Sequence, residues 1–217
     1  FKNLANKGDL SIRIFAMLHN NRDDYDSFLS IGPEAEDPFL KVQALKIYMD
    51  GALGSRGAAL LEPYSDDPGN FGLLRTEVPD LATLVKTFNA AGFQVNTHGI
   101  GDRAIRLILD MYEQHADPAL RNRIEHAQNI HKDDIPRFKE LGVIPSMQAT
   151  HCTSDMYWAD ERLGDARLHE AYPWQSLIKT GVVIPGGSDT PVEHPDPLEG
   201  IYAAVTRQDK TGWPVGG

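Results

Sequence analysis

The chain has 217 residues, of which 41% are hydrophobic and 24% charged, and 31 acidic against 21 basic side chains give it a formal net charge of −10 at pH 7. This composition is typical of a globular protein, so we expect residues 1–217 to form a single domain. An acidic surface repels phosphate backbones, and the sequence has no run of 18 apolar residues, so we expect neither a nucleic-acid partner nor a membrane span.

The two ends of the chain and its single cysteine bear on its origin. The opening "FKNLANKGDL" has no apolar signal-peptide core, and a lone Cys152 forms no intrachain disulfide, which together favour a cytoplasmic location. The chain begins on Phe1 rather than on methionine, so we expect it to be a piece of a longer protein.

Apolar segments and helical spacing alternate along most of the chain. Runs rich in β-branched residues predict strands at 11–18, 42–49, 93–98, 122–127, 143–148 and 182–189. Helical patterns lie at 79–91, at 102–114 with Asp102 as its N-cap, at 132–141, and in a segment that ends before Gly181. This order predicts an α/β fold with a parallel sheet, either a doubly wound open sheet or a (β/α)8 barrel that lacks two strands.

Chemically active side chains recur where the predicted strands end, at Lys46, His98, Glu125-His126, Gln148 before His151, and Ser188-Asp189. In parallel α/β folds the carboxyl ends of the strands carry the chemistry. A dinucleotide-binding domain concentrates function on its first loop, whereas a barrel brings all its strand ends to one site. The distribution therefore favours an incomplete (β/α)8 barrel.

The stretch "VNTHGIGDRA" offers a competing interpretation. Gly99, Gly101 and Ala104 fit the dinucleotide-binding fingerprint, and Glu125 lies about 20 residues on, where an acidic ribose ligand is expected. However, Asp102 would compete with a pyrophosphate for the helix N-terminus. We therefore interpret the glycines as a sharp turn behind His98, at the rim of a metal site.

Each of these residues also has a purely structural explanation. His98 could be a hydrogen-bonded core histidine, Glu125 an ion-pair partner of Arg123, and Asp189 a helix cap. Lys46 is harder to explain in this way, because a lysine among apolar strand residues is rarely buried without a partner. The recurrence of such residues at equivalent points of successive units favours metal ligation.

Six segments, taken in this order, closely resemble the amidohydrolase superfamily: "LKIYMDGALGSRGAAL", "VNTHGIGDRAI", "RIEHAQ", "PSMQATH", "DMYWADERLG" and "GGSDTPVEHPDPLEGIYAAVTR". The resemblance is to its branch of YtcJ-like and N-substituted formamide deformylase-like hydrolases, and it extends from about residue 40 to the end. It implies a distorted (β/α)8 barrel that holds one or two divalent metal ions, usually zinc.

The resemblance also implies roles for single residues. Lys46 resembles the fourth-strand lysine, which is carboxylated in many members, while His98 and His126 resemble the fifth- and sixth-strand ligands. Asp189 resembles the eighth-strand aspartate, a metal ligand that accepts a proton from a metal-activated hydroxide and passes it to the leaving amine. The family's first-strand His-x-His pair and its small β-sandwich have no counterpart in this sequence.

These roles predict a metal-dependent hydrolase of carbon–nitrogen bonds in small amide or N-formyl substrates. We expect Arg56, His151, Trp158 and Arg162, in long loops after strands, to line the substrate pocket. Two alternatives stay open: a deaminase on the same scaffold, and a catalytically incomplete fragment that only binds a metal or ligand. Because a barrel without two strands has open sheet edges, we expect self-association into a homo-oligomer.

Overall fold

Five parallel strands form the central sheet of the computed structural model, which describes residues 1–20 and 25–216. Along the sheet they follow the order of the chain, each pairing in parallel with the next: β1 (Ile14–His19), β2 (Leu40–Tyr48), β3 (Gln94–Gly99), β4 (Arg123–His126) and β5 (Ile144–Ser146). A doubly wound sheet reverses its strand order, whereas a barrel wall adds each strand on the same side. The α/β barrel expectation is therefore confirmed, and the open doubly wound sheet is excluded.

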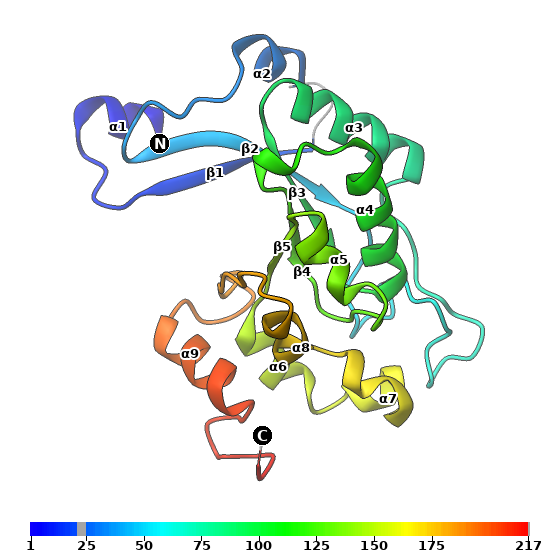
Figure 1. Cartoon of the computed structure of the whole chain (residues 1–217). Helices are drawn as coiled ribbons and strands as arrows, with labels where there is room; N and C mark the ends of the chain where they lie inside the picture. Colours follow the sequence, from blue (N-terminus) through cyan, green and yellow to red (C-terminus); the bar gives the residue numbers. More distant parts are fainter. Residues whose placement is uncertain (21–24, 217) are drawn as a thin grey trace.

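Helices cover this sheet and extend beyond it. In Figure 1, α3, α4 and α5 run beside the strands, and α6 to α9 gather toward the C-terminus. Within the described residues no helix is both long and apolar enough to cross a bilayer. The α-helices are α1 (Lys2–Lys7), α2 (Tyr25–Ile31), α3 (Val78–Ala90), α4 (Asp102–His115), α5 (Ile135–Glu140), α6 (Ala149–Asp155), α7 (Ala159–Leu163), α8 (Trp174–Lys179) and α9 (Pro197–Thr206), with 3₁₀ turns at Pro118–Leu120 and Asp165–Glu170.

Strand alternation separates the core from the inner face of the sheet. Leu45 and Ile47 of β2 are fully buried and belong to the main core, together with apolar side chains of α3 and α4. Because successive strand residues point to opposite faces, Lys46 and Tyr48 lie on the inner face. The same alternation that buries Leu45 and Ile47 in the core therefore places the Lys46 side chain on the inner face of the sheet.

Two predicted features differ in the structure. The sixth predicted strand, 182–189, is reduced to one isolated parallel bridge between Met147 and Gly186. Among the described residues, the segment 182–189 pairs with a neighbour on one side only. Its two consecutive glycines weaken a strand further. Asp102 is the first residue of α4 rather than its N-cap, which is Gly101, and its side chain accepts a hydrogen bond from the Leu61 amide at 2.9 Å.

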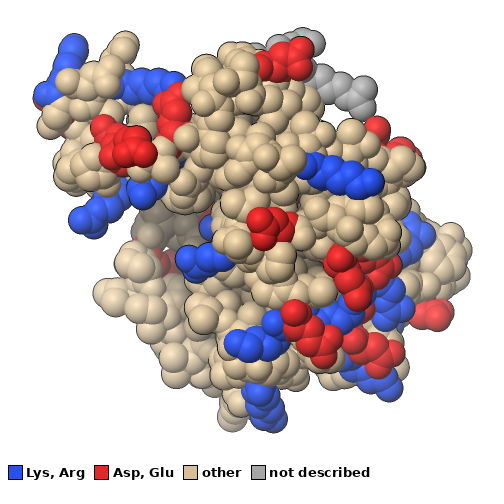
Figure 2. Space-filling model, turned by 45° about the horizontal axis from the view of Figure 1, so that its top comes forward, with Lys and Arg blue, Asp and Glu red and all other residues tan. Residues whose placement is uncertain are grey.

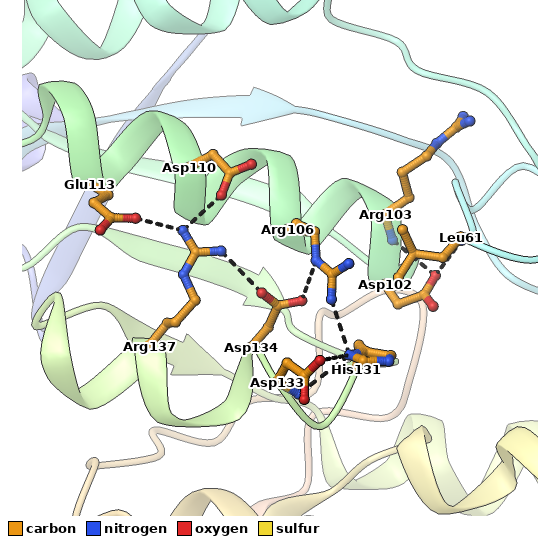
Figure 3. Close-up of polar contacts among 10 residues, drawn as sticks. All are labelled: Leu61, Asp102, Arg103, Arg106, Asp110, Glu113, His131, Asp133, Asp134 and Arg137. Carbon is orange, nitrogen blue, oxygen red and sulfur yellow. Dashed lines mark hydrogen bonds and ion pairs between the residues drawn. The ribbon is translucent and has the colours of Figure 1, made fainter.

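The distribution of charge on the surface is mixed. On the face that Figure 2 draws, Lys and Arg side chains lie scattered and often stand beside Asp or Glu. One cluster of such pairs joins α4 to α5 (Figure 3). There, the buried carboxylate of Asp134 accepts hydrogen bonds from Arg106 Nε at 2.9 Å and Arg137 Nη1 at 3.0 Å. Arg137 also donates to Asp110 and Glu113 on α4.

We expect Asp134→Ala to lower the free energy of unfolding by about 2–3 kcal/mol. Removing one partner of a fully buried ion pair costs about 3–5 kcal/mol, and the partial exposure of both guanidinium groups reduces this figure. Urea unfolding followed by circular dichroism measures the change. The matched control is Asp133→Ala, whose side chain is 70% exposed; a shift as large as that of Asp134→Ala would contradict the role of the buried carboxylate.

Candidate active site

A cavity of about 480 Å³ lies at the carboxyl ends of the strands. It brings together six of the eight predicted site residues: Lys46, His98, His126, His151, Trp158 and Asp189. The other described residues around it are Tyr48, Ala52, Leu53, Gly54, Ile100, Gln128, Asp155, Val192 and Glu193. The metal ligands implied by the resemblance therefore face one common space.

Backbone geometry explains how both strand histidines reach this cavity. His98 and Glu125 are register partners on β3 and β4, so simple alternation would point the next residue, His126, toward the opposite face. Instead, His126 and Ala127 have φ values of 71° and 45°, which turn the chain at the end of β4. The imidazole rings of His98 and His126 consequently lie with their centroids 4.5 Å apart.

The hydrogen bonds of the histidines leave ring nitrogens free for a ligand. His126 Nδ1 lies 2.8 Å from Gln148 Oε1; because an amide oxygen can only accept, Nδ1 donates and Nε2 keeps its lone pair. His98 Nε2 lies 3.4 Å from Asp50 Oδ1 but forms no hydrogen bond with the described residues, so this buried nitrogen is also without a partner. His151 Nε2 is buried without a hydrogen-bond partner among the described residues. The hydrogen bond from His126 to Gln148 is typical of a metal-ligating imidazole, and the unpartnered nitrogens of His98 and His151 are available as ligands, so this donor set fits a divalent metal ion.

The charge states of the residues that line the cavity also fit the binding of a metal ion. Burial, reinforced by the neighbouring cationic groups, lowers the pKa of both His98 and His126 to about 3, so both imidazoles are neutral at neutral pH, the form that binds metal. Burial also lowers the pKa of Lys46, against the opposing influence of Glu125 and Asp189. A lysine must lose its positive charge before it can serve as a ligand, and burial assists that loss.

Asp50 organises the turn behind His98, a role that the sequence analysis did not assign. Its carboxylate has no solvent exposure and accepts hydrogen bonds from the backbone amides of Ala59 at 2.9 Å, Ile100 at 3.1 Å and Gly101 at 2.8 Å. Burial raises its pKa to about 7. The amides of Ile100 and Gly101, which a nucleotide loop would direct at a pyrophosphate, are therefore engaged by a carboxylate, which supports the interpretation of a turn.

Arg56 and Arg162 do not line the cavity, contrary to the expectation for substrate-pocket residues. Arg56 pairs with Asp66 at 2.7 Å, and Arg162 pairs with the same carboxylate. Arg162 also donates from Nε to the Gly54 carbonyl at 3.2 Å and lies 5.8 Å from the centre of the Trp158 ring. The structure therefore places the two arginines behind a cavity wall whose inner surface Gly54 and Trp158 form.

Two carboxylates of the cavity, Asp155 and Glu193, were not singled out from the sequence. Asp155 ends α6, and Glu193 lies in the loop after Asp189. Neither directly follows a strand, so the strand-end pattern could not find them. Their only signal in the sequence is proximity to His151 and Asp189.

Comparisons with known proteins agree on one family. The model of a family described as "Amidohydrolase family" matches residues 1–214. The chain is 34% identical over 209 residues to YtcJ of Bacillus subtilis, which is named as an amidohydrolase; the match covers 96% of this chain and 39% of YtcJ. It is 27% identical over 192 residues to the N-substituted formamide deformylase of Arthrobacter pascens, covering 84% of this chain and 34% of that enzyme.

A solved structure extends this similarity to three dimensions. An uncharacterized metal-dependent hydrolase from Pyrococcus horikoshii matches with a TM-score of 0.87 and 34% identity, over 95% of this chain and 41% of that protein. The chain thus spans about two fifths of the length of YtcJ and of the Pyrococcus protein.

Proposed function

Since this chain belongs to the amidohydrolase family, we propose that it is part of a metal-dependent hydrolase that cleaves a carbon–nitrogen bond in a small amide or N-formyl compound. The observation that carries the proposal is the pair of buried, neutral imidazoles of His98 and His126, 4.5 Å apart beside Lys46 and Asp189 in one cavity. The name of the Arthrobacter relative, a formamide deformylase, supports the choice of bond.

The four residues have distinct parts in this proposal. Lys46, as its carbamate, and Asp189 supply oxygen ligands, while His98 and His126 supply the nitrogen ligands that suit zinc. One or two divalent ions held by these residues would supply a Lewis acid and would lower the pKa of a water molecule. Asp189 would accept a proton from the attacking water on a carboxylate oxygen and would deliver it to the leaving nitrogen. His151 Nε2, buried without a partner in the described part of the chain, binds the polar end of the substrate.

Metal content tests the proposed ligand set. We expect the 217-residue chain, purified with zinc and without chelator, to hold zinc near stoichiometry by plasma emission, and the variant His98→Ala/His126→Ala to lose it. The control is His115→Ala/His169→Ala, whose side chains lie outside the cavity. Absence of zinc from the parent chain, or zinc retained by the His98/His126 variant, would contradict the ligand set.

A further inference from the structure

The cavity has a second chemically distinct wall that the proposed metal ligands do not use. Asp155 at the end of α6, Trp158 just before α7, and Glu193 in the loop after Asp189 all line it. Lys46 is the only lysine or arginine among the described lining residues, and the proposed metal site already uses it. This second wall therefore combines two carboxylates with an aromatic ring and has no positive charge of its own.

The carboxylate of Asp155 is held by neutral groups. Its Oδ2 atom accepts hydrogen bonds from Gln128 Nε2 at 2.8 Å and from the Tyr172 hydroxyl at 2.6 Å. Within the described part of the chain, no lysine or arginine forms an ion pair with it. A partly buried carboxylate is ordinarily paired with a cation, because solvent no longer compensates its charge fully. Apart from the neighbouring His151 imidazole, which stabilises its charge, Asp155 thus has no cationic partner among the described residues.

Glu193 adds a second negative charge to the same wall. Its Oε1 atom accepts a hydrogen bond from the Ser154 hydroxyl at 2.6 Å, again a neutral donor. Ser154 directly precedes Asp155 in α6, so this hydrogen bond holds Glu193 on the same wall as Asp155, where the two negative charges repel each other. A cation bound between them would relieve this repulsion.

Trp158 completes a surface suited to a cation. Its ring lines the cavity, and the negative face of an indole attracts ammonium and guanidinium groups. The Arg162 guanidinium behind the wall, 5.8 Å from the ring centre, helps to hold the ring in position. A volume of about 480 Å³ accommodates a small ligand that reaches both walls.

We infer that this wall binds a positively charged group at the amine end of the substrate, so the substrate class is an amide of a diamine or of a similar amine with a cationic tail. The inference rests on the proposed function for the position of the amide bond. The amide group would lie at His98 and His126, and the ammonium would lie between Asp155 and Glu193, beside Trp158.

Binding of two matched probes tests this inference. N-(4-aminobutyl)acetamide carries a terminal ammonium where N-pentylacetamide carries a methyl group, and the two are otherwise alike. We expect calorimetry on the zinc-loaded chain to show about 10- to 100-fold tighter binding of the cationic probe, the range for hydrogen bonds to charged groups. The variant Asp155→Asn/Glu193→Gln should reduce this preference to less than threefold without changing the affinity for N-pentylacetamide.

Controls separate this inference from the proposed function. Asp160→Asn/Glu161→Gln, outside the cavity, should keep the full preference, and Glu193→Gln alone should reduce it if the double variant fails to fold. Equal affinities in the parent chain, or a preference that persists in the double variant, would overturn the inference while zinc binding stands. If the purified chain fails to bind zinc but still binds the cationic probe more tightly than N-pentylacetamide, the proposed ligand set is contradicted and the inference about the cation-binding wall stands.

Discussion

In the full-length protein, Asp189→Asn is expected to lower kcat by about 10²- to 10⁴-fold, the range for loss of a general acid–base group. Asp189 lines the cavity, and its φ of 54° lies in the left-handed region. Asparagine adopts this region more readily than most residues, so the substitution removes the basic carboxylate without straining the backbone. The change in kcat therefore reports on proton transfer rather than on folding.

The assay for Asp189→Asn needs saturating zinc, because the same carboxylate is a proposed metal ligand. Turnover of N-formyl and N-acetyl amines, normalised to the metal content of each preparation, separates ligation from proton transfer. Asp133→Asn, at an exposed position outside the cavity, serves as the matched control. Normalised turnover equal to that of the parent enzyme would exclude Asp189 as the proton carrier.

Strand ends were enough to collect most of the residues that line this cavity, whereas their roles as metal ligands came from the resemblance to the amidohydrolase superfamily. Lys46 and His98 follow directly from alternation, because each lies on the inner face near the end of a strand. The position of His126 at the end of a strand marked it as a candidate. Its orientation could not be predicted, because it depends on positive φ values at His126 and Ala127. Such backbone turns leave no clear pattern among ordinary residue types.

Contacts between distant segments account for most of what the sequence could not predict. Arg56 and Arg162 look like free cations in the sequence, and only the fold brings both to Asp66. Asp155 reaches the cavity because Gln128 and Tyr172 hold its carboxylate there. The segment 182–189 has the composition of a strand, but its extent depends on partners on both sides, which residue composition does not encode.

Gly101 shows how the structure decides between two interpretations of one motif. Its φ of −78° is open to any residue, so the requirement for glycine comes from space and not from backbone conformation. A Cβ atom there would lie 2.0 Å from the Ala59 carbonyl oxygen and 2.5 Å from its carbonyl carbon. That oxygen already accepts hydrogen bonds from the amides of Arg103 and Ala104. The glycine thus allows two backbone segments to meet directly behind His98.

We therefore expect Gly101→Ala to destabilise the chain by at least about 3 kcal/mol, the upper end for overpacked sites, because backbone atoms must move to make room. The same movement would pull the Gly101 amide away from Asp50 and lower zinc affinity through His98. Gly200→Ala in α9 is the control: its Cβ would meet nothing within 4 Å, so stability should stay equal or rise by up to about 1 kcal/mol. Thermal unfolding and zinc titration measure both effects. A folded Gly101→Ala variant with unchanged zinc affinity would show that this turn does not influence the proposed metal site, and that β3 alone positions His98.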